Sequence, residues 1–394
     1  MNVAILGAGP AGLYFGYLLK RRFPGAQVRI VEQNPAGATF GFGVVFSDRA
    51  LEFLRDDDPE TYAAIAPLLE AWEDIAIVHR GERILIDGVG FSAVGRLDLL
   101  RVLQSRARSV GVEPEYERKI ESVDEFDAAD LIVGADGANS TLRQSFARQF
   151  GAEVTHGSNH FAWFGTRQRF DTLTQTFRTA AFGHCNAHHY RYAPDMSTFI
   201  VEVDAASFAR AGFARMSESE AKDACERAFA EDLGGHALVS NRSVWRRFPT
   251  VRNERWSHGR CVLVGDALHT AHFSIGSGTR LAIEDAIALD RAIGEHPRDV
   301  RDALQSFEAA RRPVLEKLLA AADRSRIWYE HFAEHMRHPP IEFAMRYVMR
   351  SGRIDLERLR AQSPRFVARW EKQRRMPSGA VIPGRGRERS EPTT

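Results

Sequence analysis

The chain has 394 residues, of which 44% are hydrophobic and 27% charged, a composition typical of soluble globular proteins. This length exceeds what one hydrophobic core comfortably supports, so we expect two domains that share a cleft. The 53 basic and 52 acidic residues give a formal net charge of +1, which excludes a global field that would attract nucleic acid or an anionic membrane.

The N-terminal segment predicts a strand, a glycine turn, a helix and a second strand. The first strand covers residues 3–6, the helix about 11–22 and the second strand 28–32. The apolar stretch has glycines at turn positions and no basic leader, unlike a signal peptide. No segment reaches the ~18 uninterrupted apolar residues that a membrane span needs. We therefore expect a cytoplasmic protein that opens with a nucleotide-binding sheet.

The next elements continue an alternation of strands and helices. Residues 76–88 predict a β-hairpin, and the helix that follows carries an apolar stripe through Leu97, Leu100 and Leu103. Residues 129–135 form a short apolar strand that runs into a turn. Residues 160–203 are rich in β-branched and aromatic residues between turn signals, which predicts an inserted antiparallel sheet.

The last part of the chain is expected to be mostly helical. A helix is predicted at 215–232 and a buried strand at 261–267, and helices dominate from about 279 to 372. The last twenty residues are rich in Arg, Pro, Gly and Ser, so we expect disorder there. The three cysteines, at 185, 225 and 261, form no CxxC pair, which argues against a disulfide framework or a structural zinc site.

Gly7, Gly9 and Gly12 form a GxGxxG pattern between the first strand and its helix. Gly7 permits a tight turn, Gly9 lets the backbone approach a pyrophosphate, and Gly12 allows close packing of helix on strand. Glu32, at the end of the second strand, can accept hydrogen bonds from ribose hydroxyls. An acid at this place argues against a 2′-phosphate, so the pattern predicts bound FAD or NAD and not NADP.

Two further motifs follow in order, GADGANSTLR at 134–143 and GDALHTAHFSIGSG at 265–278. With the N-terminal GAGPAG, they resemble the three marks of the FAD-dependent aromatic hydroxylases of the p-hydroxybenzoate hydroxylase type, which are single-component flavoprotein monooxygenases. The resemblance implies that Asp266 binds the ribityl chain of FAD and that Arg96 lies near the pyrophosphate. It also implies that Asp136 and Arg143 serve flavin and nicotinamide. The full set expected to bind cofactor is Gly7, Gly9, Ala11, Gly12, Glu32, Gln33, Gly43, Val44, Arg96, Asp136, Arg143, Asp266, Gly276, Ser277 and Gly278.

The family's fold implies an α/β protein with a Rossmann-like FAD-binding domain, an inserted and mainly antiparallel β-sheet substrate domain, and C-terminal helices. The expected boundaries are 1–74, 95–155 and 251–320 for the FAD-binding domain, 75–94 for a hairpin of the substrate domain and 156–250 for its main part, 321–374 for the helical region and 375–394 for a disordered tail. One departure concerns the third motif: Phe273 stands near the family's usual proline, and Ile275 where glycine is frequent. We expect the flavin-facing loop to be shaped differently.

Several longer stretches look like the flavin hydroxylases that act on aryl-CoA thioesters. These stretches are 39–51, 196–203, 233–241, 271–289 and 350–371, and the central ones are also similar to the indole-ring hydroxylase of violacein biosynthesis. The C-terminal stretch favours the aryl-CoA group. Some members of that group carry a fused reductase-like domain, and here we expect the hydroxylase part alone.

The resemblance implies an NADPH- or NADH-dependent enzyme that uses O₂ and hydroxylates an aromatic ring through a flavin C(4a)-hydroperoxide. We expect it to be a monomer or a homodimer without nucleic-acid or membrane partners. On the strand NAHHYRY, His188 and Tyr190 share one face, so either they line the substrate cleft or they form an ordinary sheet face. Phe46 and Val45 lie in the pocket or in the core, and His272 is a candidate to face flavin or substrate.

Other chemistries fit the sequence less well. His184, Cys185 and His188 suggest a metal, but residues four apart on an extended strand are about 13 Å from each other, too far to share one ion. No GxSxG, CxxC or WxWxIP motif is present. Two alternatives stay open: a hydroxylase of a free indole or other small aromatic, and a flavin-binding redox sensor.

The substrate choice turns on charge, because a CoA thioester carries phosphates that arginines bind. The chain has 48 arginines against five lysines, so arginines are expected almost anywhere on its surface. The candidates for the cleft mouth are Arg167, Arg169, Arg246, Arg247 and Arg252.

Overall fold

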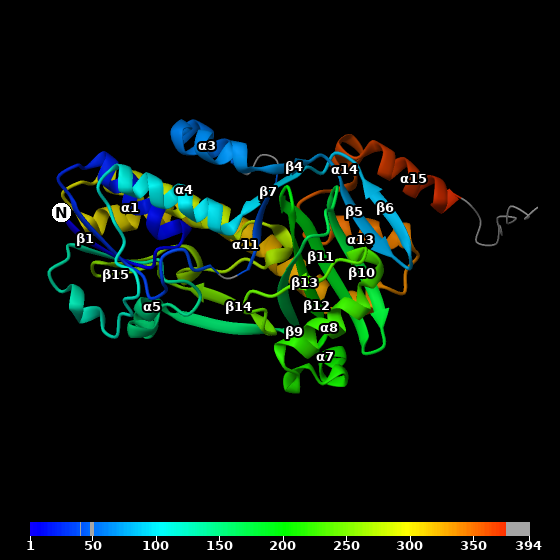
Figure 1. Cartoon of the computed structure of the whole chain (residues 1–394). Helices are drawn as coiled ribbons and strands as arrows, with labels where there is room; N and C mark the ends of the chain where they lie inside the picture. Colours follow the sequence, from blue (N-terminus) through cyan, green and yellow to red (C-terminus); the bar gives the residue numbers. More distant parts are fainter. Residues whose placement is uncertain (40, 48–50, 376–394) are drawn as a thin grey trace, which may run out of the picture.

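A computed structural model describes residues 1–39, 41–47 and 51–375. It shows an elongated molecule with a parallel sheet and its helices at one end and a larger twisted sheet at the other (Figure 1). The predicted disordered tail lies, from residue 376 onward, outside the described residues. Within them, no helix is long and apolar enough to cross a membrane.

The first sheet has five strands in the order β15-β16-β8-β1-β2. All of its pairs are parallel except that of the edge strand β15. Its central strands are buried almost throughout, as a parallel sheet covered on both faces requires. Its strands come from distant parts of the chain: β1 Asn2–Leu6, β2 Gln27–Val31, β8 Leu131–Gly134, β15 Ser257–His258 and β16 Cys261–Leu263.

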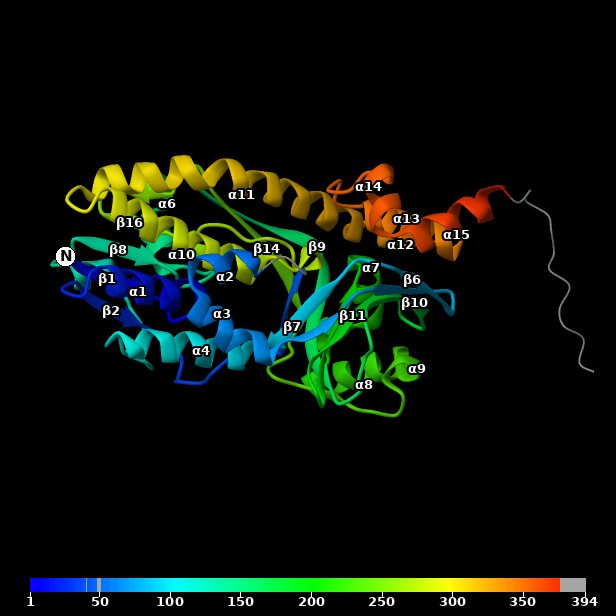
Figure 2. The same cartoon turned by 90° about the horizontal axis from the view of Figure 1, so that it is seen from above.

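Helix α1 packs between α4 and α10, and α11 packs on α10 (Figure 2). The glycine turn predicted before α1 is confirmed, as Pro10 occupies its first turn after Gly9. The larger helices of this end are α1 Pro10–Arg22, α4 Arg96–Ser109, α10 Gly278–Glu295 and α11 Val300–Glu330. The shorter ones are α2 Glu52–Asp57, α3 Pro59–Ile65, α5 Thr141–Ser145 and α6 Ala147–Phe150, with 3₁₀ turns at Ala66–Leu68 and Val123–Phe126.

The second sheet runs in the order β13-β9-β12-β11-β10-β5-β6, and β14 also pairs with β9. Only its β10–β5 pair is parallel, which confirms the expected mainly antiparallel sheet. The hairpin predicted at 76–88 is formed by β5 and β6, with Arg80 and Gly81 at positive φ in its turn. The strands are β5 Ile75–His79, β6 Glu82–Ile86, β9 Ala152–Thr166, β10 Leu173–Ala180, β11 Gly183–Ala193, β12 Met196–Val203, β13 Leu238–Val239 and β14 Arg246–Asn253.

A third, three-stranded sheet, β3-β7-β4, was not expected from the sequence. Its strands are β3 Gly43–Ser47, β4 Glu70–Trp72 and β7 Phe91–Gly95. Both β3 and β7 contact β11, so this small sheet joins the two ends of the molecule. Gly43 permits the contact, since a Cβ there would lie 2.5 Å from the Cβ of Tyr192.

Helices cover both faces of the second sheet. On one face a core cluster joins Phe199 and Val201 to Cys225 and Phe229. On the other, Ile75 and Phe177 pack with residues of the C-terminal helices, among them Phe343. The predicted helix at 215–232 is divided into two at Phe229. These helices are α7 Ala205–Ala211, α8 Glu218–Ala228 and α9 Ala230–Leu233, after a 3₁₀ turn at Phe213–Arg215, and α12 Phe332–His335, α13 Pro340–Met349, α14 Leu356–Gln362 and α15 Pro364–Arg375.

Candidate active site

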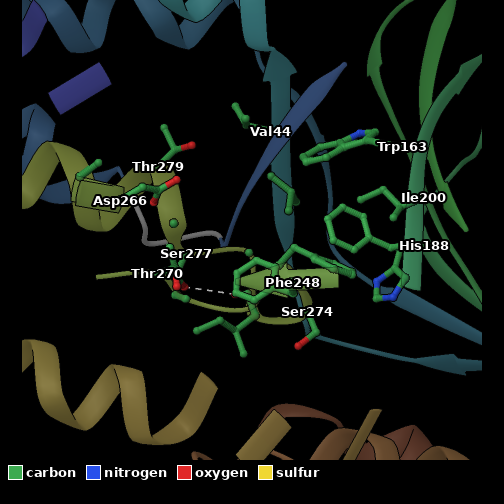
Figure 3. A pocket seen from close by; sticks show the side chains of 18 of the residues that line it. Val44, Trp163, His188, Ile200, Phe248, Asp266, Thr270, Ser274, Ser277 and Thr279 are labelled. Carbon is green, nitrogen blue, oxygen red and sulfur yellow. Dashed lines mark hydrogen bonds between the residues drawn. The ribbon is translucent and has the colours of Figure 1, made fainter. Parts of the chain in front are cut away.

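A cleft of about 830 Å³ lies between the two ends of the molecule. One end is formed by the carboxyl ends of the parallel strands, where an open α/β sheet binds its ligands, and includes Gly9 and Asp266. The other end is formed by the second sheet, with Trp163, His188 and Ile200 in its wall (Figure 3). The cleft is therefore lined by residues of both ends of the molecule.

Gly7 and Gly12 of GxGxxG have the steric roles that their spacing predicts. A Cβ on Gly12 would lie 2.0 Å from the carbonyl oxygen of Gly7, and Gly7 itself has φ of 101°. Both positions are therefore restricted to glycine by helix–strand packing and by the turn. Gly9 lines the cleft, and a Cβ there would meet no atom within 4 Å. Its backbone is open to a bound ligand.

Glu32 directly follows β2, beside the glycine turn. One carboxylate oxygen accepts a hydrogen bond from the Ala8 amide at 3.0 Å, and the other accepts from the amide of Asn34 at 2.8 Å. These bonds fix the carboxylate next to the turn. Neither Glu32 nor the exposed Gln33 lines the cleft, so their predicted contact with a ribose stays a prediction.

Arg96 and Asp266 enter the same part of the cleft from different elements. Arg96 is the first residue of α4, and its Nε is enclosed with no hydrogen-bond partner among the described residues. Desolvation lowers the pKa of Arg96, while the charge of Asp266 raises it. Asp266 is exposed to the cleft but deep in the molecule, and desolvation raises its pKa. A free guanidinium and a carboxyl group thus face one space, ready for phosphate and hydroxyl partners.

The second motif stabilises the wall of the cleft. One Asp136 oxygen accepts a hydrogen bond from the Thr141 amide at 2.6 Å, while the other is enclosed without a partner. Arg143 is 3% exposed, and it donates hydrogen bonds to the carbonyls of Ala267 and Ala138. Neither Asp136 nor Arg143 lines the cleft. Arg143 connects the second motif to the third, and its predicted contact with cofactor stays a prediction.

Phe273 and Ile275, which stand where the family usually has proline and glycine, lie in a 3₁₀ turn of the third motif's loop. His272 caps a 3₁₀ turn over Phe273–Ile275 through its Nδ1, which accepts from the Ser274 amide and lies 2.8 Å from the Ser274 hydroxyl. Gly276 follows with φ of 59°. His272 is buried behind the loop and does not line the cleft, whereas Phe273, Gly276, Ser277 and Gly278 do. The imidazole therefore shapes the loop from behind it.

His269 belongs to a buried ion-pair network. Its Nε2 lies 2.7 Å from Asp285, whose other oxygen accepts from Nε of Arg311 at 2.9 Å. Among the described residues, no group of three or more His, Cys, Asp or Glu side chains is placed to hold a metal ion.

The far end of the cleft is an aromatic chamber formed mainly by the second sheet and the third motif. His188 lies there, with its ring centroid 5.1 Å from that of Phe273 and 5.0 Å from that of Tyr329. Tyr190 also lines the cleft, but its hydroxyl donates to the Gly43 carbonyl at 3.0 Å and burial raises its pKa. Tyr190 therefore positions β3, which makes Gly43 a packing residue.

Two residues predicted beside the flavin edge have different surroundings. Val45 lines the cleft, as does Val44, while Phe46 is fully buried in the core of the FAD-binding end. The sequence left pocket and core open for both Val45 and Phe46. These two side chains point to opposite faces of β3, but face alone does not decide, because Val44, on the same face as Phe46, also lines the cleft.

A family model described as an FAD binding domain matches residues 1–125 and 100–322. Salicyloyl-CoA 5-hydroxylase of a Streptomyces species is 43% identical over 361 residues, which are 89% of this chain and 70% of that protein. The chain belongs to the FAD-dependent aromatic monooxygenases. It uses FAD, with NAD(P)H as electron donor, and acts on an aromatic substrate with O₂.

Two further relatives of this monooxygenase cover most of its length. The 3-hydroxy-4-methyl-anthranilyl-[aryl-carrier protein] 5-monooxygenase of Streptosporangium sibiricum is 36% identical over 84% of this chain and 89% of its own. Protodeoxyviolaceinate monooxygenase of Chromobacterium violaceum is 35% identical over 88% and 94%. Among solved structures, 2-methyl-3-hydroxypyridine-5-carboxylic acid oxygenase has the same fold, with a TM-score of 0.67 over 93% of this chain and 97% of its own at 18% identity.

The observed residues fit FAD. Gly9, Arg96 and Asp266 line one stretch of the cleft, where the Gly9 backbone is unobstructed and Asp266 is exposed. These are the groups that a pyrophosphate and ribityl hydroxyls need. Of the residues expected to bind cofactor, the cleft is lined by Gly9, Ala11, Val44, Arg96, Asp266, Gly276, Ser277 and Gly278.

Sequence reasoning missed several residues of the aromatic chamber. Phe161 and Trp163 lie two residues apart on β9 and both line the cleft, so their spacing in the sequence could have indicated a shared aromatic face. Gln175 lines the cleft from β10. Tyr347 and Arg350 come from the end of α13, which folds back over the cleft. Only the three-dimensional fold brings this distant segment to the site, where Arg350 donates to the Ser274 carbonyl at 2.7 Å.

Proposed function

We propose that this monooxygenase hydroxylates an aromatic acyl group tethered as a thioester, an aryl-CoA or a similarly carried substrate. The observation that carries the proposal is a pair of arginines, Arg246 and Arg247, which line the cleft from β14. Both are exposed, and neither has an ion-pair partner among residues 1–39, 41–47 and 51–375. Exposed guanidinium groups at a cleft mouth suit the phosphates of a CoA or phosphopantetheine arm.

The other arginines considered from the sequence are placed differently. Arg252 makes two hydrogen bonds to Asp323, both 2.9 Å long, and Arg167 pairs with Asp195 at 3.3 Å. Neither these two nor Arg169 lines the cleft. The choice of Arg246 and Arg247 therefore rests on position, in a chain where arginine is common everywhere.

The names of the relatives support the same substrate class. One acts on a salicyloyl-CoA and a second on an anthranilyl group on a carrier protein, so both take an aromatic ring held by a thioester. The third acts on protodeoxyviolaceinate, which represents the alternative of a free aromatic substrate. The free mouth arginines favour the tethered class.

The deciding experiment offers the FAD-loaded protein five compounds in air with NADH and, separately, NADPH. Salicyloyl-CoA and 2-aminobenzoyl-CoA are compared with salicylate, 2-aminobenzoate and tryptophan, and both NAD(P)H oxidation and hydroxylated product are measured. We expect product from a thioester and little from the matching free acid. Product from the free compounds alone would overturn the proposal of a tethered substrate. NAD(P)H oxidation without any hydroxylated product would count against the tethered and the free substrates tested.

A further inference from the structure

Two buried residues face each other behind the wall of the aromatic chamber. His188 on β11 and Glu202 on β12 point to the same face of the sheet, because His188 pairs in register with Ile200 and Asn186 with Glu202. Nε2 of His188 lies 3.4 Å from Oε2 of Glu202. The two residues are 4% and 1% exposed, and only His188 lines the cleft.

The hydrogen bonds around Glu202 indicate where its proton lies. Oε1 accepts from Nδ2 of Asn159 at 2.8 Å, and the same Asn159 amide donates to the Tyr329 carbonyl at 2.9 Å. Burial raises the pKa of the Glu202 carboxyl, which favours its protonated form. Oε2 of Glu202 and Nε2 of His188 are both enclosed, lie 3.4 Å apart and have no hydrogen-bond partner among the described residues. We therefore infer that the protonated carboxyl group carries its proton on Oε2, facing Nε2 of His188.

This arrangement fixes the tautomer of His188. Burial lowers its pKa to about 3, so the ring is neutral and holds one proton. Because Nε2 faces Oε2 of Glu202, we infer that the ring proton lies on Nδ1, the nitrogen that is not enclosed by the protein. The ring cannot turn freely, because Tyr329 stacks on it and Phe273 meets its edge.

Gln175 is the cross-strand neighbour of His188 and lines the same wall. Its Oε1 accepts from the Tyr329 hydroxyl at 3.0 Å, which leaves the Nε2 amide as the free, donating end. His188 and Gln175 therefore place two N–H donors side by side in the wall of the chamber. Glu202 orients the first and Tyr329 the second.

The charged and titratable groups around this pair are already engaged. Arg350 donates to the carbonyls of Ser274 and Tyr347 and to the Ser325 hydroxyl. Arg326 pairs with Glu330 at 2.8 Å on α11, and His272 caps its own loop. His188 and Gln175 are therefore the groups left to bind a ligand atom directly, while Arg350 adds positive potential to the same end.

We propose that His188 and Gln175 form a two-donor site for an oxygen substituent on the aromatic ring of the substrate, with the protonated Glu202 holding His188 in its donating tautomer. The proposal deepens the proposed function by naming a ring hydroxyl, bound best when ionised, as a substrate feature. It rests on the chamber being where the ring binds, but it does not depend on the tether. An ionised ring oxygen is a strong hydrogen-bond acceptor, and it also enriches the ring that is to be hydroxylated.

The test measures how the FAD-loaded protein, without NAD(P)H, ionises bound 4-nitrophenol, a probe that has a ring hydroxyl and no tether. Difference absorbance against the flavoprotein alone gives the pH at which the bound phenol becomes phenolate. In the wild type we expect the ionisation constant to exceed that of the probe in water by about tenfold or more. His188→Phe and Gln175→Met should each lose much of this gain.

Substitutions of Glu202 separate a positioning role from mere packing. Glu202→Gln keeps an N–H donor towards His188 and should retain the wild-type ionisation, whereas Glu202→Leu should lose it. His189→Gln, which alters the neighbouring histidine on the opposite face of β11, is the matched control and should behave as wild type. FAD content and the thermal transition of each variant report folding.

Two results would overturn the proposal. One is a bound phenol that ionises in the wild type as it does in water, and the other is Glu202→Gln behaving like Glu202→Leu. Because 4-nitrophenol has no tether, failure here is distinct from failure of the thioester substrates. Success here together with product only from free aromatics would retain the two-donor site and reject the tether.

Discussion

Arg143 donates a hydrogen bond from Nη1 to the main-chain carbonyl of Ala267 at 2.9 Å, across 124 residues of sequence. This contact joins the turn after β8 to the turn after β16, two segments whose strands lie side by side in the parallel sheet. Both turns flank the cleft, because Gly137 and Asp266 line it. The guanidinium therefore aligns the second and third motifs at the edge of the cleft.

Replacing Arg143 should weaken both the fold and FAD binding. Arg143→Gln leaves buried carbonyls without their donors, so we expect the free energy of unfolding to fall by about 1–3 kcal/mol. FAD release should rise in parallel, measured by flavin fluorescence after dilution. Arg148→Gln, an exposed arginine on the next helix, is the control and should change stability by less than about 0.5 kcal/mol. Equal losses of stability in the two variants would mean that the hydrogen bond from Arg143 to Ala267 does not stabilise the fold.

The first motif allows its glycines to be separated by role. Gly12→Ala should prevent normal folding, because the new Cβ would lie 2.0 Å from the Gly7 carbonyl oxygen. Gly9→Ala meets no protein atom within 4 Å, so it should fold with a near-normal thermal transition but retain less FAD. Thermal unfolding and the flavin content of the purified variants test this. A Gly9→Ala protein with full flavin would show that the backbone at Gly9 does not approach the cofactor.

Local sequence patterns were enough to predict some parts of the molecule. The strand, turn and helix around Gly7 to Gly12 depend on neighbours in sequence, and so does the hairpin at 75–86. The β3-β7-β4 sheet was missed because its three short strands pair over long separations. Arg350 reaches the cleft only because α13 folds back over the second sheet, and no local signal encodes that contact.

The place of a residue in the site was predictable where the end of a strand fixes it. Asp266 emerges at the end of a buried strand, as its sequence position indicated. His272 was expected to face flavin or substrate, but the loop turns its ring inward, where Nδ1 caps Ser274. Phe46 and Val45 show the same limit, because the depth of each residue along β3, as well as the face it points to, decides between core and cleft.

The buried network of His269, Asp285 and Arg311 should control acid stability. Burial raises the pKa of Asp285, but His269 and Arg311 together hold it below its ordinary 3.8. Its contribution to stability is therefore present above pH 3.8 and is lost as pH falls through the lower folded value. Asp285→Asn should cost up to about 3–5 kcal/mol near neutral pH, since it removes the buried charge that His269 and Nε of Arg311 share and leaves Arg311 only its ion pair with Glu284. Asp127→Asn, at an exposed ion pair, should cost about 1 kcal/mol or less in the same urea titrations.

The mouth arginines should affect binding of the tether more than the chemical step. If Arg246 and Arg247 bind its phosphates, Arg246→Gln combined with Arg247→Gln should raise KM for salicyloyl-CoA about tenfold or more, with little change in kcat. The effect should shrink for the pantetheine thioester, which lacks the nucleotide phosphates, and at high salt. Arg167→Gln combined with Arg169→Gln provides a control of equal charge away from the cleft. A fall in kcat at unchanged KM would point instead to a role in the reaction.

Glu202 should make the stability of this monooxygenase depend on pH in a way that its amide variant does not. Burial raises the pKa of Glu202 above its ordinary 4.5, so the stabilising contribution of the protonated form is fully present below pH 4.5 and is lost as pH rises through the folded value. His188 acts oppositely: with its pKa lowered to about 3, it contributes stability above its ordinary 6.5 that is lost as pH falls towards 3. Glu202→Gln removes only the first dependence.

The advantage of Glu202→Gln over the wild type should therefore grow with pH. Between pH 4.5 and the raised folded value, the difference in unfolding free energy should increase by up to about 1.4 kcal/mol per pH unit. Urea titrations from pH 4.5 to 9 measure this difference, with Glu121→Gln, at an exposed carboxylate, as the matched substitution. A pH-independent difference for Glu202→Gln would show that Glu202 ionises as easily in the folded protein as in the unfolded chain. In that case the carboxyl group would not be the proton donor that fixes the tautomer of His188.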